Sequence, residues 1–147
     1  MTEKLTAAPR PPQSAEEFAA YYELRWRVLR EPWSLPRGSE RDELEGSAYH
    51  LGIFSSGTPM AVGRLHQMDS RKGQIRCMAV DEAYQRRGLG SDILRGLENE
   101  ARLQDLDQIF LNGRGNAVLF YEKHGYEVVS TGPKFWGIKH FGMLKQL

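Results

Sequence analysis

Two spacings of apolar residues along the chain distinguish expected helices from expected strands. Residues 14–30 carry an apolar side chain every three or four positions, the spacing of one helix face. Ser14 with Glu17 three positions later is a capping box that starts this helix, and Pro32 ends it. The apolar stripe of the helix consists of Phe18, Tyr21, Leu24 and Val28.

The rest of the chain predicts strands first and then an alternation of strands and helices. Apolar side chains at every fourth position predict a long helix over residues 88–104, and a shorter helix is expected at 116–124. Polar residues 55–58 join two strands as a hairpin, and acidic residues 40–45 are expected to form a short helical turn. The expected strands are residues 48–54, 59–68, 74–80, 108–111, 126–129 and 138–144, with polar or Gly-Pro interruptions at 69–72 and 131–133. This order predicts one mixed sheet with helices on both faces.

Length and composition set the frame for these elements. The 147 residues suffice for one domain with a core, expected at residues 14–147. Residues 1–13 hold three prolines and form a tail or at most a short edge strand; they show no apolar signal core. The net charge of +1 and the lack of a long apolar stretch argue against nucleic-acid and membrane partners. Cys77 is the only cysteine, so we expect no disulfide, no cysteine-built metal site and a reducing, cytoplasmic location.

The segment that follows residue 80 is the strongest candidate for ligand binding. An apolar strand stops there, a turn rich in Arg and Gly follows, and a helix starts at Leu89. Glycines let a ligand approach the backbone, and a helix start offers N–H groups and partial positive charge to an anion such as pyrophosphate. A nucleotide P-loop is excluded because no Lys follows Gly88 or Gly90. A dinucleotide fingerprint is excluded because Ile93 stands where its third glycine would be.

Two motifs in this half of the chain resemble one enzyme superfamily. Residues 85–90 read Gln-Arg-Arg-Gly-Leu-Gly, a Q/R-x-x-G-x-G/A pattern. Residues 109–126 read as a strand, an Asn- and Gly-containing loop and a helix ending in Phe-Tyr-x-x-x-Gly-Tyr. In order and spacing both resemble the GCN5-related N-acetyltransferase (GNAT) superfamily, the first of them its coenzyme A pyrophosphate loop. Asn116 is expected to cap the start of the short helix and Gly125 its end.

This resemblance implies a fold, a donor and a set of binding residues. The implied fold is an α/β fold of α+β type, a GNAT-like mixed, largely antiparallel sheet of six to seven strands with about four helices on both faces. Acetyl-CoA would give its acetyl group directly to a primary amine in a ternary complex, with pantetheine paired to the strand at 74–80. The coenzyme-binding residues so implied are Met78, Ala79, Val80, Gln85, Arg86, Arg87, Gly88, Leu89, Gly90, Ser91, Asn116 and Tyr121.

Catalysis needs an acid and a base: the resemblance implies the acid, and several residues remain candidates for the base. The resemblance places Tyr121 near the coenzyme sulfur as general acid for the leaving thiolate, the alternative being a core aromatic. A lysine-like amine with a pKa of about 10.4 must lose a proton, which costs roughly 4–5 kcal/mol at pH 7. The superfamily often uses a Glu on the strand at 74–80, and this chain has none there. The base candidates are Glu45 and His50, with His66 and His140 as further alternatives, although each histidine also suits a structural role.

Several interpretations stay open alongside this one. Acidic residues 40–45 are either a solvated helix face or an attractor for a cationic amine. Cys77 is expected to be a small buried residue rather than an acetylated nucleophile, and Arg114 has no role that the sequence assigns. A non-catalytic acetyl-CoA-binding sensor or interaction module is the alternative function. The acceptor amine, small molecule or peptide, is not identified, and a homodimer is compatible with the family pattern.

Overall fold

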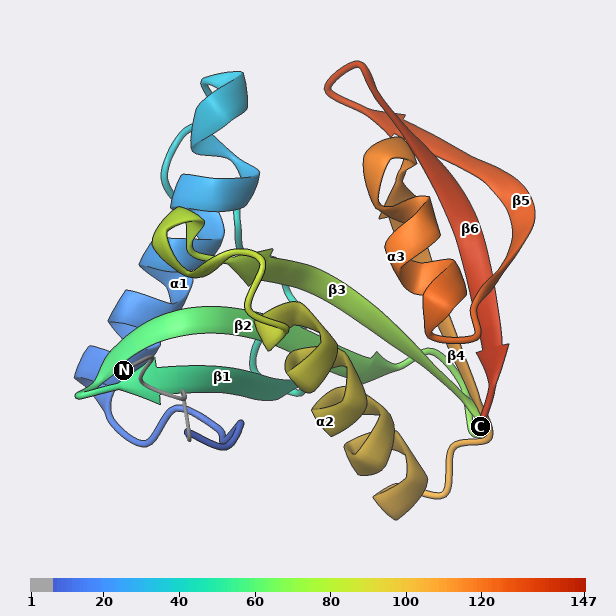
Figure 1. Cartoon of the computed structure of the whole chain (residues 1–147), viewed down its shortest axis with the longest axis horizontal. Coiled ribbons are helices and arrows are strands. Elements are labelled where there is room, and N and C mark those ends of the chain that lie inside the picture. The colour runs from blue at the N-terminus through green and yellow to red at the C-terminus, as the bar shows by residue number, and fades with distance from the viewer. Residues whose placement is uncertain (1–6) are drawn as a thin grey trace. The chain divides into compact units, whose positions relative to one another are not determined.

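The computed structural model describes residues 7–147 and contains one mixed, mostly antiparallel sheet of six strands in the order β1-β2-β3-β4-β6-β5 (Figure 1). The strands are β1 (Tyr49–Ser55), β2 (Thr58–Gln67), β3 (Lys72–Val80), β4 (Gln108–Arg114), β5 (Glu127–Phe135) and β6 (Ile138–Gln146). The α-helices of the described residues are α1 (Ala15–Leu29), α2 (Leu89–Leu103) and α3 (Val118–Lys123). The predicted fold class is confirmed, with three α-helices in residues 7–147 instead of about four.

The chain divides into two compact units, and each combines segments that are distant in sequence. The first unit comprises Met1–Arg64 and Cys77–Leu97. The second comprises Leu65–Arg76 and Glu98–Leu147. The predicted phosphate loop belongs to the first unit and the Phe-Tyr motif to the second.

In the first unit α1 and α2 pack on opposite faces of β2 (Figure 1). Tyr21 and Leu24 of α1 are buried together with Val62 of β2. At the next strand position, a Cβ on Gly63 would lie only 2.7 Å from Cγ2 of Ile93 in α2. Because neighbouring residues of a strand point to opposite faces, the two helices cover the two sides of β2. The missing side chain at Gly63 lets α2 approach the strand closely.

The hairpin and the N-terminal segment follow their sequence signals. Ser56 and Gly57 join β1 to β2 with φ values of 50° and 81°, the left-handed pair of a two-residue hairpin turn. Arg10 forms a single bridge with Gly52, with N···O distances of 2.8 and 2.9 Å in the two directions. The short edge strand expected as one alternative for this segment is therefore one bridge, within the part of the tail that the structure describes.

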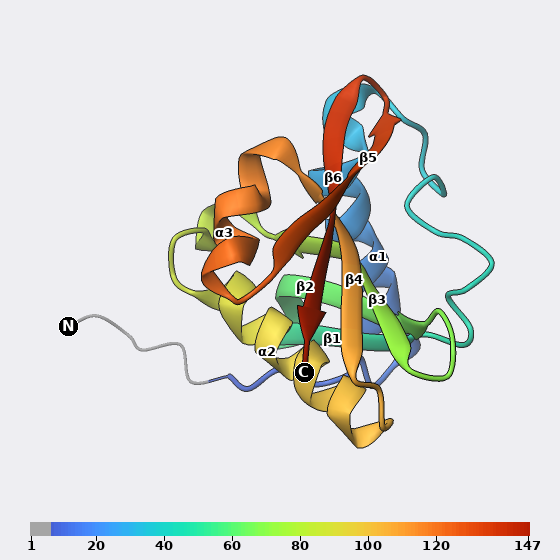
Figure 2. The same ribbon diagram turned by 90° about the vertical axis from the view of Figure 1, so that its right-hand side faces the viewer.

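In the second unit β6 lies between β4 and β5 (Figure 2). The start of β3 pairs in parallel with the start of β4, from Lys72↔Gln108 to Gln74↔Phe110. The Thr-Gly-Pro interruption at 131–133 does not end β5. It coincides with a register shift between Thr131 and Lys134, and a second shift lies just before it, between Val128 and Ser130. β4 extends three residues further than predicted because its pairing with β6 continues to Arg114↔His140.

The two predicted caps of α3 had different outcomes. Gly125 has φ 91°, and the N–H groups of Gly125 and Tyr126 donate to the carbonyls of Glu122 and Tyr121 at 3.0 and 3.1 Å. This is a Schellman motif, so the C-terminal prediction is confirmed. The N-cap prediction is wrong: Asn116 lies inside the 3-10 turn Gly115–Ala117, and the capping position makes no side-chain hydrogen bond. The longer β4 leaves only this tight turn between strand and helix.

Candidate active site

The predicted phosphate loop is an exposed turn between the 3-10 turn Glu82–Tyr84 and α2. Gly88 has φ 79°, a backbone conformation that residues with a side chain rarely adopt. A Cβ at Gly88 would meet no described atom within 4 Å beyond its chain neighbours. Arg86 is also left-handed, with φ 65°, whereas Leu89 is buried and anchors the start of the helix. The backbone at Gly88 therefore needs glycine for its conformation and presents an open surface.

The start of α2 supplies the donors that an anion needs. The Asp92 N–H donates to the Gly88 carbonyl at 3.1 Å, so helical hydrogen bonding begins at Gly88. The N–H groups of the first turn of a helix have no acceptor inside that helix, and the helix dipole adds partial positive charge there. The first-turn acid, Asp92, is paired with Arg95 at 2.7 Å. This arrangement is suited to binding phosphate.

Asp81 fixes the path of the chain from β3 into the loop. Its N–H donates to the Met60 carbonyl at 2.8 Å. One carboxylate oxygen accepts from the Ala83 N–H at 2.9 Å and the other from Arg27 at 3.0 Å. Partial burial would raise the pKa of Asp81, but these two donors hold the pKa below its ordinary value. The loop thus starts from a point held by both β2 and α1.

In the second unit α3 places Tyr121 across β4. A Cβ at Gly113 would lie 3.2 Å from Cδ2 of Tyr121 and 3.1 Å from Sδ of Met143, so the ring fills the space above a glycine. The ring of Tyr126 packs edge-on at 5.9 Å. Burial raises the pKa of Tyr121 to about 12, and the charge of Arg114 opposes this rise. The phenol is therefore protonated at neutral pH and able to donate a hydrogen bond.

The coenzyme role of the remaining predicted residues stays a prediction, and the structure gives their exposure. Met78 and Val80 are half-buried in β3 and Ala79 is buried in the core with Tyr21. Cys77 is partly buried and has φ 60°, which interrupts the regular extended backbone of β3. Gln85, Arg86 and Arg87 are exposed in the loop, Gly90 and Ser91 are half-buried at the start of α2, and Asn116 is exposed.

Residues 40–45 form turns rather than the expected helical turn, and their side chains divide between the surface, where Glu43 is exposed, and the interior, where Glu45 is buried. Oε2 of Glu45 accepts from Arg25 and from Arg64, at 2.8 Å each, and both arginine side chains are fully buried. Asp42 accepts from both terminal nitrogens of Arg64, at 2.8 and 3.1 Å. These two carboxylates are internal counterions of two buried guanidinium groups.

His50 lies in the same buried network. Its Nε2 is 2.7 Å from the Glu45 carbonyl and its Nδ1 is 3.0 Å from the Tyr21 hydroxyl. Burial lowers the pKa of His50, and the positive charges of Arg25 and Arg64 lower it further. The structure thus brings both base candidates, Glu45 and His50, into one cluster of the first unit, with Oε1 of Glu45 4.0 Å from Nε2.

The two further histidine candidates lie in different strands. His66 is buried in β2. His140 is buried in β6, where Nδ1 lies 2.9 Å from the Ile138 carbonyl and burial lowers its pKa. The residues that sequence reasoning missed are Arg25 and Arg64. Their positions in the sequence could have indicated burial, because Arg25 is four residues from Tyr21 on the buried helix face and Arg64 lies inside an apolar strand.

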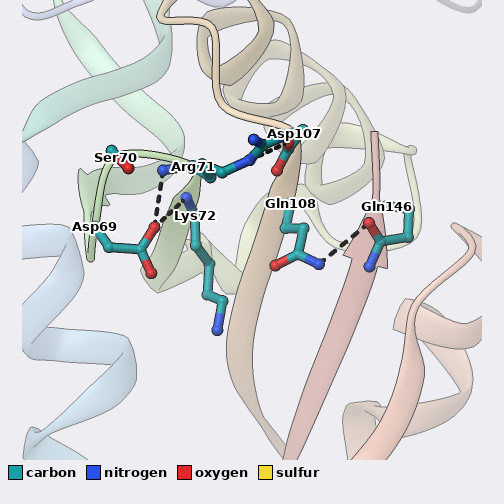
Figure 3. Close-up of a pocket in the computed structure, with 7 residues that line it drawn as sticks. All are labelled: Asp69, Ser70, Arg71, Lys72, Asp107, Gln108 and Gln146. Carbon is teal, nitrogen blue, oxygen red and sulfur yellow. Dashed lines mark hydrogen bonds and ion pairs between the residues drawn. The ribbon is translucent and has the colours of Figure 1, made fainter.

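A cavity of about 530 Å³ lies at the edge of the second unit where β3 and β4 begin and β6 ends (Figure 3). Asp69 accepts from the backbone N–H groups of Arg71 and Lys72 at 2.8 Å each. The guanidinium of Arg71 pairs with Asp107, with Nε at 2.8 Å, and the Gln108 amide donates to Gln146. These groups mainly bind one another and include no predicted site residue, so the cavity is not a candidate active site.

Two further observations concern residues 7–147 as a whole. In this described range no helix is long and apolar enough to cross a membrane. The same range contains no group of three His, Cys, Asp or Glu side chains arranged to hold a metal ion.

Comparison with known proteins assigns the family. Residues 18–126 match the model of the Acetyltransferase (GNAT) family. The chain is 30% identical over 135 residues to the uncharacterized N-acetyltransferase YjcF of Bacillus subtilis (strain 168), covering 90% of this chain and 95% of that protein. An acyl-CoA N-acyltransferase from Pseudomonas aeruginosa has a TM-score of 0.80 at 23% identity, covering 94% of this chain and 97% of that one. A GNAT family acetyltransferase from Elizabethkingia anophelis, solved with acetyl-CoA bound, has a TM-score of 0.73 at 15% identity and 97% coverage of each chain. With its motifs, its sheet order and these matches, the chain belongs to the GNAT acetyltransferase family.

Proposed function

We propose that this protein transfers the acetyl group of acetyl-CoA directly to a primary amine in a ternary complex. The observation that carries the proposal is the open, left-handed backbone at Gly88 next to the start of α2. A pyrophosphate would accept hydrogen bonds from the first-turn N–H groups there, within reach of the exposed Arg86 and Arg87. The acetyl-CoA bound to the Elizabethkingia anophelis neighbour supports the choice of coenzyme.

The reaction is balanced without any further reagent. The amine nitrogen attacks the thioester carbonyl, the C–N bond forms, and the C–S bond breaks after the tetrahedral intermediate. The amine loses its proton to a base, and the departing thiolate receives one from the Tyr121 phenol, which solvent then reprotonates. Positioning of an already activated thioester supplies much of the remaining acceleration.

We retain both base candidates, and the network constrains each of them. Oε2 of Glu45 is occupied by Arg25 and Arg64, so a proton placed there would compete with two guanidinium donors. The lowered pKa of His50 keeps its ring neutral near pH 7, which is the form that accepts a proton. Both ring nitrogens of His50 are hydrogen-bonded, whereas Oε1 of Glu45 has no hydrogen-bond partner among the described residues, so the network leaves both candidates open.

The test is a matched pair of glycine substitutions. Gly88 and Gly137 share φ 79°, and a Cβ added at either would meet no described atom within 4 Å, so Gly88→Val and Gly137→Val introduce similar backbone strain. We expect calorimetric titration with coenzyme A to show loss of binding only in Gly88→Val. Equal affinities for the two variants would exclude the loop as the pyrophosphate site.

A panel of amines, followed by thiol release from acetyl-CoA, tests turnover and acceptor class together. Coenzyme binding without thiol release for any amine would favour the non-catalytic sensor instead.

A further inference from the structure

The Tyr21 hydroxyl has three hydrogen-bond partners but only one proton to give. It lies 2.9 Å from the Gly63 carbonyl, 3.1 Å from Nη2 of Arg25 and 3.0 Å from Nδ1 of His50. A carbonyl only accepts, a guanidinium only donates, and an imidazole nitrogen does either. Burial raises the pKa of Tyr21 above its ordinary value, so the hydroxyl keeps its proton. The direction of that proton thus depends on His50.

The hydrogen-bonding role of the other ring nitrogen of His50, Nε2, is fixed by its partner. Nε2 lies 2.7 Å from the Glu45 carbonyl, which accepts only, so Nε2 carries a proton in every state of this network. If the Tyr21 hydroxyl donates to Gly63, it must accept from both Arg25 and Nδ1, and His50 is then doubly protonated. If His50 is neutral, Nδ1 accepts from Tyr21, and the Gly63 carbonyl loses its hydroxyl donor.

We propose that Tyr21 and His50 form a two-state proton switch, in which proton uptake by Nδ1 turns the Tyr21 hydroxyl from His50 to the Gly63 carbonyl. In this device Tyr21 is a positioning residue, because it supplies the acceptor for the new Nδ1–H. The switch does not depend on acetyl transfer and goes beyond the proposed function. It also makes Nδ1 the only ring nitrogen at which His50 takes up a proton.

The charges around His50 decide how the two states balance. From α1 the ring meets Tyr21, Tyr22 and Phe18 edge-on, at 5.3, 6.1 and 5.6 Å between centroids, and Arg25 lies beyond Tyr21. From the other elements it faces the Glu45 carboxylate and the guanidinium of Arg64 on β2.

Burial and the two arginines oppose the charged ring, while Glu45 favours it. Oε1 of Glu45 is buried, has no hydrogen-bond partner among the described residues and lies 4.0 Å from Nε2. Protonation of His50 therefore pairs its ring with the one carboxylate oxygen that the arginines do not bind. It also strengthens the Nε2–H bond to the Glu45 carbonyl, since hydrogen bonds from charged donors are stronger.

The test is an NMR pH titration of the His50 ring in the full-length protein, comparing Tyr21→Phe with Tyr22→Phe. Loss of the Tyr21 oxygen removes a charge-assisted bond from the protonated state and a neutral one from the unprotonated state. We expect Tyr21→Phe to weaken proton binding at His50 at least about 3-fold, equivalent to half a pKa unit. Tyr22→Phe, whose ring also packs against His50, is expected to change it less. Proton affinity that is unchanged or increased in Tyr21→Phe would overturn the switch.

A second measurement needs no variant and decides the question even if Tyr21→Phe does not fold. Nitrogen-15 shifts of the His50 ring in the unmodified protein, recorded above its titration, report which nitrogen carries the proton. The switch requires the Nε2–H tautomer. Observation of the Nδ1–H tautomer would show that Nδ1 is not the acceptor, and the proposal would fail.

Discussion

Replacement of Glu45 by Gln is expected to lower the melting temperature by about 10–16 °C. Glu45 is the only carboxylate that binds Arg25 in the described residues, and it shares Arg64 with Asp42, whose side chain is 26% exposed. The amide of Gln keeps the size but loses the charge, and its NH2 group cannot accept from a guanidinium. Removal of one partner from a buried ion pair costs about 3–5 kcal/mol. An unfolding entropy of about 2.1 cal/mol/K per residue over 147 residues converts each kcal/mol into about 3 °C.

The assay is differential scanning calorimetry without substrate, so that no catalytic role of Glu45 enters the result. Glu43→Gln is the control, because Glu43 belongs to the same acidic segment and is exposed. A surface substitution of this kind changes stability by no more than about 0.5 kcal/mol. If Glu45→Gln melts within about 2 °C of the control, less than the shift expected from 1 kcal/mol, the buried arginines do not depend on Glu45 and our account of the network is wrong.

Two further predictions concern the candidate catalytic groups. Tyr121→Phe is expected to lower kcat by roughly 10- to 1000-fold with little change in coenzyme affinity, because it removes the proton donor and keeps the ring over Gly113. Steady-state thiol release measures kcat, and an unchanged kcat would remove Tyr121 from the mechanism. The free energy of unfolding is expected to fall as pH drops below about 6.5, because the unfolded chain protonates His50 first while the folded pKa is lower. Urea unfolding at pH 7.5 and 5.5 measures this loss, and His50→Gln, if folded, should reduce it; an identical pH dependence in the variant would refute the assignment to His50.

Local signals predicted the elements that depend on local interactions. The Ser14 cap is present, with the Glu17 N–H donating to the Ser14 hydroxyl at 3.1 Å. The hairpin turn and the Gly125 cap also need only neighbouring residues, and both were predicted. The start of α3 was not, because the length of β4 depends on pairing with β6, some 30 residues later in the chain. Asn116 is a good capping residue by type, but the extended strand moved the helix start past it.

The burial of Arg25, Arg64 and Glu45 was not predicted, although the sequence contains the information for it. Two arginines occupied positions that the apolar pattern assigned to the interior, Arg25 on the buried face of the first helix and Arg64 in the middle of a strand. A guanidinium enters the interior only with a counterion, because an unpaired buried charge is very costly. The acidic run at 40–45 lies between these two arginines in the chain and contains the carboxylates that pair with them. Combining the charges with the apolar pattern would thus have predicted that Glu45 points into the interior, where it lies in one cluster with the other base candidate, His50.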